Sequence, residues 1–187
     1  MLRAGASVLD IGCGAGRIAG PLASAGFEVT GIDDAPAMLE ALPSTVAGIL
    51  ADARSVRLGR TFDAVLVLSH LLNEPADGPA FAATAAAHLL RDGLVIGEIY
   101  PRDWQPEASV GRETRVGDIG IVLERARRIG DLVDAEVRYD VAGQRWRQPF
   151  VARILDPSAL SALLGSVGLR FERWLDRPGF FAARLRP

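Results

Sequence analysis

The stretch VLDIGCGAGR, residues 8–17, decides the fold of this 187-residue chain. It starts within a short apolar run, SVLDI at residues 7–11, and continues into a glycine-rich turn. Gly12 and Gly14 allow the backbone to approach a ligand closely, because a side chain at either position would block it. The residues after the turn can continue as a helix, whose free amides favour a carboxylate or phosphate. The stretch therefore predicts a ligand-binding turn between a buried strand and a helix.

Asp10 stands two residues before the first glycine of this turn. Dinucleotide-binding folds place a similar glycine-rich turn at the same point, so the turn alone does not separate one cofactor from another. A carboxylate here would repel a pyrophosphate, but it suits a ligand that carries an ammonium group. Cys13, the only cysteine, has no neighbouring base that marks it as a nucleophile, so we expect its backbone amide to matter more than its thiol.

Strand and helix patterns alternate along the rest of the first hundred residues. Short apolar runs predict further strands at 27–32, 48–51, 62–70 and 93–100. An Ala-rich helix is expected over roughly 78–91. This rhythm predicts a parallel sheet with right-handed crossovers. At the end of the chain, a helix opened by Pro157 precedes two apolar runs, 169–175 and 180–186, which we expect to form a hairpin.

Residues 101–155 interrupt that rhythm. The segment 101–113 reads as a loop, and apolar and polar residues then alternate at 132–141 and 146–154. With a further strand at 119–129, they predict a three-stranded antiparallel layer. Such a layer must bury its apolar face. We expect it to lie above the carboxyl ends of the main strands and to pair with a second copy in a homodimer.

Further stretches, in order along the chain, extend the pattern begun by VLDIGCGAGR. They are GFEVTGIDDAPAML (26–39), ADA (51–53), FDAVLVLSHLLN (62–73) and LRDGLVIGEIY (90–100). Together they resemble the motifs of the class I S-adenosylmethionine-dependent methyltransferases, over about 1–100 and 155–187. One departure is Asp92-Gly93-Leu94, where the family usually has Pro-Gly-Gly.

The resemblance implies a fold and a domain organisation. The fold is α/β, with a doubly wound, Rossmann-like sheet of seven strands in the order 3-2-1-4-5-7-6, the seventh antiparallel. The whole chain, 1–187, would be one S-adenosylmethionine-binding domain, with 101–155 as an inserted antiparallel β cap. Family members usually carry an amino-terminal helix that covers the cofactor, whereas Met1 lies only a few residues before the first strand. We expect 101–155 or a partner chain to provide that cover.

The resemblance also implies which residues hold S-adenosylmethionine. Asp33 would grip the ribose hydroxyls, Asp52 would bond the adenine amine, and Ala53 would offer its amide. Asp34 is either a solvated helix cap or a second ribose contact, and Met38 either packs on adenine or belongs to the core. The expected cofactor-binding set is Asp10, Gly12, Cys13, Gly14, Gly16, Asp33, Asp34, Met38, Asp52, Ala53 and Ser69.

The residues expected to bind the methyl acceptor follow the fourth and fifth strands or lie in the inserted segment. His70 can act as a general base near neutral pH; alternatively it touches the cofactor through its backbone or packs on the next helix. Asn73 either orients the acceptor or makes a cap or loop bond. Tyr100 is expected to line the pocket. Trp104 and Trp146 either wall an apolar acceptor site or form the core of the antiparallel layer.

Composition excludes several classes of protein. With 21 basic and 23 acidic residues the net charge is −2, which provides no electrostatic footprint for nucleic acid. No apolar run approaches the ~18 residues of a membrane span, and no clustered ligands indicate a metal site. Asp10 interrupts the start before a signal-peptide core could develop, so we expect a cytoplasmic protein.

The function implied by the resemblance is methyl transfer from S-adenosylmethionine to a small-molecule acceptor through an N, O, C or S atom. An alternative is a non-methylating member of the same fold, which uses S-adenosylmethionine in a rearrangement or only binds it. A nicotinamide oxidoreductase is disfavoured by Asp10.

Overall fold

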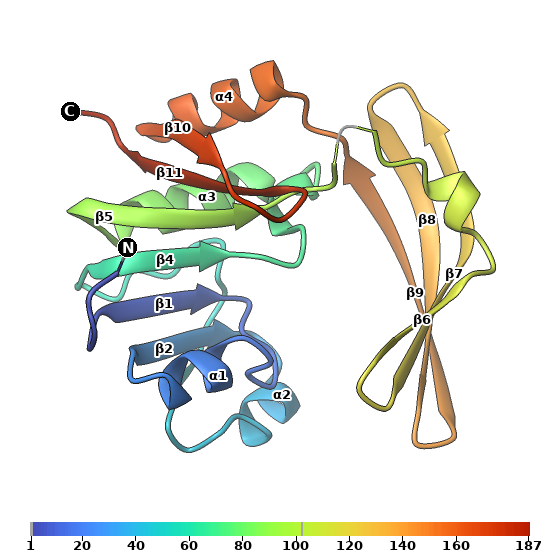
Figure 1. Ribbon diagram of the computed structural model, residues 1–187, viewed down its shortest axis with the longest axis horizontal. Helices are drawn as coiled ribbons and strands as arrows, with labels where there is room; N and C mark the ends of the chain where they lie inside the picture. Colours follow the sequence, from blue (N-terminus) through green and yellow to red (C-terminus); the bar gives the residue numbers. More distant parts are fainter. Residues whose placement is uncertain (1, 102) are drawn as a thin grey trace.

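The computed structural model describes residues 2–101 and 103–187 and contains two β-sheets (Figure 1). The larger sheet has seven strands in the order β3-β2-β1-β4-β5-β11-β10. Their bounds are β1 Ser7–Ile11, β2 Glu28–Asp33, β3 Ala47–Leu50, β4 Phe62–Val67, β5 Leu89–Glu98, β10 Leu169–Trp174 and β11 Phe180–Leu185. Strands β1 to β5 are parallel, and β11 runs antiparallel to both β5 and β10. The predicted order, with its last strand antiparallel, is confirmed.

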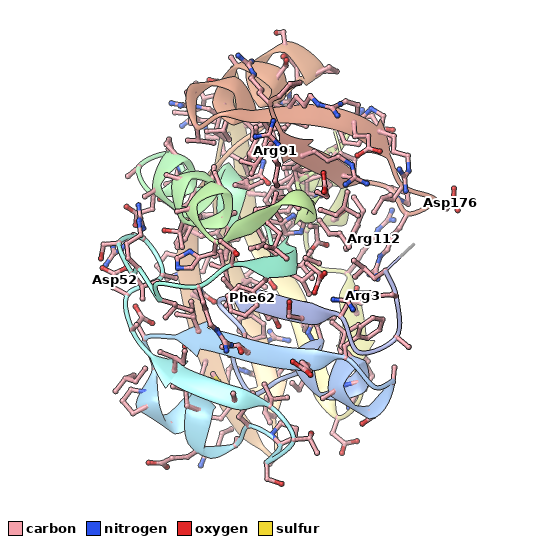
Figure 2. All side chains as sticks on the ribbon, turned by 90° about the vertical axis from the view of Figure 1, so that its left-hand side faces the viewer. Arg3, Asp52, Phe62, Arg91, Arg112 and Asp176 are labelled. Atoms are coloured by element: carbon pink, nitrogen blue, oxygen red, sulfur yellow. The ribbon has the colours of Figure 1, made fainter. Side chains whose placement is uncertain are left out.

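Helices cover both faces of this sheet because its central strands are apolar on both sides. They are α1 Ala19–Ser24, α2 Pro36–Glu40, α3 Gly78–Ala87 and α4 Pro157–Ser166. On one face Val8 and Leu66 pack with Ala19 of α1. On the other face Leu9 and Val65 belong to the cluster that includes residues of α3 and α4. Phe62, at the start of β4, lies inside the domain and is 1% exposed (Figure 2).

Two element ends differ from the sequence prediction for identifiable reasons. The Ala-rich helix ends at Ala87 rather than near residue 91. The His88 ring follows it and forms hydrogen bonds on both of its nitrogens. Nδ1 of His88 lies 2.7 Å from the Thr84 carbonyl oxygen, and Nε2 accepts a hydrogen bond from the Leu58 amide at 2.9 Å. Strand β4 ends at Val67, before residue 70, because the backbone beyond it turns into the left-handed region.

The smaller sheet is antiparallel, in the order β6-β7-β8-β9 (Figure 1). Its strands are β6 Glu113–Val116, β7 Ile119–Ile129, β8 Leu132–Val141 and β9 Gln144–Arg153. The expectation of three strands is therefore wrong by one: β6 is exposed throughout and shows no apolar alternation, so its sequence carries no strand signal. Figure 1 shows this sheet opposite the carboxyl ends of the parallel strands, where the insertion was expected to lie.

The antiparallel sheet packs on the larger domain through a small apolar cluster. Val133, Ala135 and Ile154 are buried there against the partly buried rings of Tyr100 and Trp104. Among the residues that the structure describes, no helix has both the length and the apolar character that crossing a membrane requires.

Candidate functional site

The glycine-rich turn after β1 is held against the end of β2. The amide of Gly12 donates a hydrogen bond to the Ile32 carbonyl oxygen at 2.9 Å, with φ at +70°. Gly16 also has a positive φ, +83°, and a Cβ there would lie 2.8 Å from Leu42 Cδ1 and 2.9 Å from Pro43 Cδ. These two positions therefore require glycine, and the turn stays open on its outer side.

Asp33, the last residue of β2, fixes the same turn. Its Oδ2 accepts a hydrogen bond from the Gly14 amide at 2.8 Å, and its Oδ1 accepts one from the Ala35 amide at 3.0 Å. Each carboxylate oxygen has a further lone pair. The side chain can therefore hold the turn and still accept hydrogen bonds from a pair of ribose hydroxyls.

Two hollows meet at Gly12. The first, of about 310 Å³, is lined by acids from β2 and from the loop after β3; the second, of about 170 Å³, lies over the turn and the end of β4. Of the expected cofactor residues, nine line one or both of these hollows: Asp10, Gly12, Cys13, Gly14, Asp33, Asp34, Asp52, Ala53 and Ser69. A long bent ligand could place a nucleoside in the first hollow and an amino-acid end in the second.

Asp10 is the buried charge of the second hollow. Its residue is 3% exposed, and burial raises the pKa of its carboxyl from 3.8 to about 7; Asp33 raises it further, while Arg17 opposes the rise. A buried carboxylate is costly unless a cation pairs with it. This position therefore suits a ligand ammonium group.

Asp52 departs from the expected arrangement. Both of its oxygens are held by the Arg54 guanidinium, with Nε to Oδ1 at 2.8 Å and Nη2 to Oδ2 at 3.0 Å. Arg54 also reaches Asp77 Oδ2 at 3.1 Å, on the far side of the first hollow. Figure 2 shows Asp52 at the edge of the domain, where the Arg54 hydrogen bonds lower the pKa of its carboxyl. An adenine amine at Asp52 would have to share it with Arg54.

Asp34 and Met38 lie just before and within α2. Asp34 makes no capping hydrogen bond, since the residue before α2 is Ala35 and it has no side-chain cap; Asp34 is exposed and lines the first hollow. Met38 is 49% exposed, so it does not belong to the core. Met38 and Gly16 lie outside the lining of both hollows.

The acceptor-side residues gather where β4 and β5 end. Ser69 and His70 both have positive φ, 56° and 60°, which turns the His70 ring towards β5. The ring stacks on Tyr100 at 3.8 Å between centroids, and Tyr100 stacks in turn on Trp104 at 4.0 Å. Three predicted residues are therefore in direct contact.

Glu98 is a site residue that the sequence analysis missed. It ends β5, and its Oε2 accepts a hydrogen bond from the Ser69 amide at 2.8 Å. Its Oε1 lies 3.9 Å from His70 Nε2. Burial lowers the pKa of His70 below its ordinary 6.5, and Glu98 partly opposes this. An acid two residues before Tyr100 on the same strand face was the available signal.

Asn73 is buried beside this cluster, and Trp146 lies away from it. Asn73 is 1% exposed; its Nδ2 donates to the Arg153 carbonyl oxygen at 2.6 Å, and its Oδ1 accepts from the Tyr100 amide at 3.1 Å. Asn73 therefore makes the loop bonds that the sequence analysis allowed, and it links the two ends of the insertion. Trp146 is 49% exposed, beside Tyr139 and near the β8–β9 turn, beyond the part of the sheet that the larger domain covers.

No group of three or more His, Cys, Asp or Glu side chains that could hold a metal ion is found within residues 2–101 and 103–187. The site is instead a set of two hollows with a buried acid, bordered by an aromatic stack and facing a second sheet. This arrangement can bind a charged nucleoside derivative and place a second molecule beside it.

Known proteins resemble this chain in sequence and in fold. Residues 8–93 match the family described as "Methyltransferase domain". The chain is 31% identical over 170 residues to a ubiquinone biosynthesis O-methyltransferase of Methylobacterium sp. (strain 4-46), covering 76% of this chain and 67% of that protein. A relative of the same name from Methylobacterium nodulans is 38% identical over 96 residues, which span only 38% of its length.

Solved structures share the fold over almost the whole chain. CalS10, described as an amino pentose methyltransferase from Micromonospora echinaspora with S-adenosylmethionine bound, is 29% identical with a TM-score of 0.72; the match covers 97% of this chain and 84% of that one. KedS8, described as a sugar N-methyltransferase from Streptoalloteichus, is 24% identical with a TM-score of 0.74, covering 98% and 81%.

Proposed function

This chain belongs to the class I S-adenosylmethionine-dependent methyltransferases, and on that premise we propose that it transfers the methyl group of S-adenosylmethionine to a small-molecule acceptor. The observation that carries the proposal is the pair of hollows that share Gly12, with Asp33 in one and the buried Asp10 in the other. The names of the relatives, which include O- and N-methyltransferases of small molecules, support it.

The residues of the two hollows fit the cofactor in chemical terms. Asp33 would hold the ribose hydroxyls, Ala53 would border the adenine, and Asp10 would pair with the ammonium of the methionine part. When bound, S-adenosylmethionine supplies an electrophilic methyl group on a positively charged sulfur. The work left to the protein is to hold the acceptor in line with that methyl group and to keep water away.

His70 is our candidate for the group that accepts the acceptor's proton. It lies beside Ser69, which lines the hollow over the glycine-rich turn, and burial keeps its imidazole neutral at neutral pH. A neutral imidazole can take up a proton, and a proton acceptor within reach of the reacting atom contributes roughly 10²–10⁴-fold. Tyr100 and Trp104 would form one wall of the acceptor site.

The antiparallel sheet would cover the acceptor and could join two copies of the chain. Ile119 and Trp146 are large apolar residues on one face of this sheet, and they are 36% and 49% exposed. We propose that they pair with a second copy in a homodimer. Light scattering at micromolar concentration should give twice the 19.9 kDa mass of the chain; the monomer mass alone at every concentration would exclude the dimer.

A screen for S-adenosylhomocysteine release tests the proposed function. The protein is incubated with S-adenosylmethionine and fractions of a metabolite extract, and the demethylated product is measured by mass spectrometry. Release that depends on both an added fraction and intact protein is expected. If S-adenosylmethionine binds tightly and no fraction ever yields S-adenosylhomocysteine, the chain is a non-methylating member of the family.

A further inference from the structure

The carboxylate of Glu98 is fixed between the cofactor hollow and the aromatic stack. Its Oε2 is held by the Ser69 amide at 2.8 Å, and Ser69 lines the hollow over the glycine-rich turn. Glu98 is the last residue of β5, and Tyr100 follows two residues later, beyond the end of the strand. The carboxylate therefore lies next to a residue that lines the cofactor hollow, and it faces the His70 ring.

One oxygen of Glu98 remains available to a ligand. Oε1 is 3.9 Å from Nε2 of His70, which is too long for a hydrogen bond. The side chains are 17% and 30% exposed, so a small polar group can reach both. A donor nitrogen placed between them would bond the Glu98 oxygen and lie against the His70 ring.

The two side chains placed beside this carboxylate, His70 and Tyr100, carry no positive charge at neutral pH. Burial lowers the pKa of His70, so its ring is neutral at neutral pH. Burial raises the pKa of Tyr100, and Tyr139 of β8 and Glu98 raise it further, so its phenol stays protonated. The aromatic faces of the stack add a favourable surface for a cation. A fixed carboxylate among neutral and aromatic groups favours a cationic ligand and repels an anionic one.

We infer that Glu98 selects an amine as the methyl acceptor, binding it as the ammonium ion beside His70. This inference rests on the methyl transfer proposed above and names the class of its acceptor. An alcohol at the same place would donate only a neutral hydrogen bond to Glu98. A phenolate or carboxylate would be repelled by the negative charge of Glu98. Charge-assisted bonds are about twice as strong as neutral ones.

The protons and electrons balance for an amine. His70 Nε2 takes one proton from the ammonium group, and the electron pair of the broken N–H bond remains on nitrogen. That pair forms the new N–C bond while the C–S bond breaks with its electrons going to sulfur. The methylated product leaves as a secondary ammonium ion, and the proton on His70 passes to solvent.

Binding to the protein saturated with S-adenosylhomocysteine tests the inference without turnover. Benzylamine, benzyl alcohol and benzoate share a ring and differ in the charge of the group attached to it. Calorimetry should show benzylamine binding at least about tenfold more tightly than benzyl alcohol, with benzoate weakest, since ~1.4 kcal/mol corresponds to tenfold. Equal affinities for the three, or a preference for benzoate, would overturn the inference whatever any variant does.

The variant Glu98→Gln separates charge from structure. Its amide oxygen can still accept the Ser69 hydrogen bond, so affinity for S-adenosylhomocysteine should be unchanged. The preference for benzylamine over benzyl alcohol should fall to about twofold or less. Glu28→Gln, at the amino end of β2 and exposed, is the matched control and should keep the wild-type preference. An undiminished preference in Glu98→Gln would contradict the inference.

Turnover distinguishes the two proposals. If benzylamine binds through Glu98 and no amine yields S-adenosylhomocysteine, the proposal of methyl transfer is wrong and the proposal of an amine-binding site is kept. If alcohols or phenols are methylated and amines are not, methyl transfer stands and the amine inference is wrong.

Discussion

Replacing the buried Asp10 by asparagine should stabilise the protein when no ligand is bound, and the gain should depend on pH. Burial raises the pKa of Asp10 from 3.8 to about 7 in the folded chain. The folded state therefore holds a proton that the unfolded chain releases at lower pH. The stability associated with that proton is complete below the unfolded pKa, and it is lost as the pH rises through about 7. The side-chain amide of the Asp10→Asn variant carries no charge and has no such loss.

The size of the effect follows from the two pKa values. A difference of one unit corresponds to about 1.36 kcal/mol, so an ionised Asp10 costs the unliganded protein about 4 kcal/mol. Asp10 is 3% exposed, so solvent screening takes little from this figure. The unfolding free energy of Asp10→Asn minus that of the wild type should grow by about 4 kcal/mol between about pH 4 and about pH 8.

Urea denaturation of both proteins at a series of pH values measures this difference. The difference in unfolding free energy should level off above about pH 7, where Asp10 is ionised in both the folded and the unfolded wild-type chain. Saturating S-adenosylhomocysteine should remove most of the rise, because the ligand ammonium pairs with the wild-type carboxylate. A difference that stays flat with pH would show that Asp10 is not held in a costly environment, and the argument for an ammonium at this position would fall with it.

Three other substitutions test separate parts of the account. Asp33→Ala removes charge-assisted bonds worth roughly 1.5–3 kcal/mol each, so calorimetry should show at least a tenfold loss of S-adenosylhomocysteine affinity. A smaller loss would show that Asp33 does not bind the ribose. His70→Ala should lower turnover by roughly 10²–10⁴ and keep cofactor affinity. Wild-type turnover should fall as the pH drops through the His70 pKa, which burial places below 6.5; a profile without this fall would exclude the base. Asn73→Ala leaves the Tyr100 amide and the Arg153 carbonyl unpaired, and urea denaturation should show a loss of about 2–4 kcal/mol; unchanged stability would refute the link.

Local sequence patterns indicated the strands of the main sheet and the cofactor turn, and the family resemblance supplied the strand order. The glycines of residues 12–16 and the acid that ends β2 act through backbone geometry and strand order, and both leave a direct trace in the sequence. The position of the insertion followed from the same logic, because a chain that leaves β5 must cross the carboxyl edge of the sheet.

Contacts between distant side chains could not be predicted in the same way. Glu98 meets Ser69 only because β4 and β5 are neighbours and because the backbone at residues 69 and 70 is left-handed. The hydrogen bonds from Arg54 to Asp52 join neighbours in the sequence, but they depend on the rotamers of two exposed side chains, which no sequence pattern specifies. The sequence pattern predicts that the face of β9 with Trp146 is apolar. The antiparallel sheet extends past the main sheet and its helices, so they do not cover Trp146.

The most direct test of the central claim is a calorimetric titration of ligand-stripped protein with S-adenosylhomocysteine and, separately, with NAD. The account predicts saturable binding of S-adenosylhomocysteine in the hollows around Gly12 and no binding of NAD, because Asp10 favours an ammonium and repels a pyrophosphate. Binding of NAD without binding of S-adenosylhomocysteine would contradict the account.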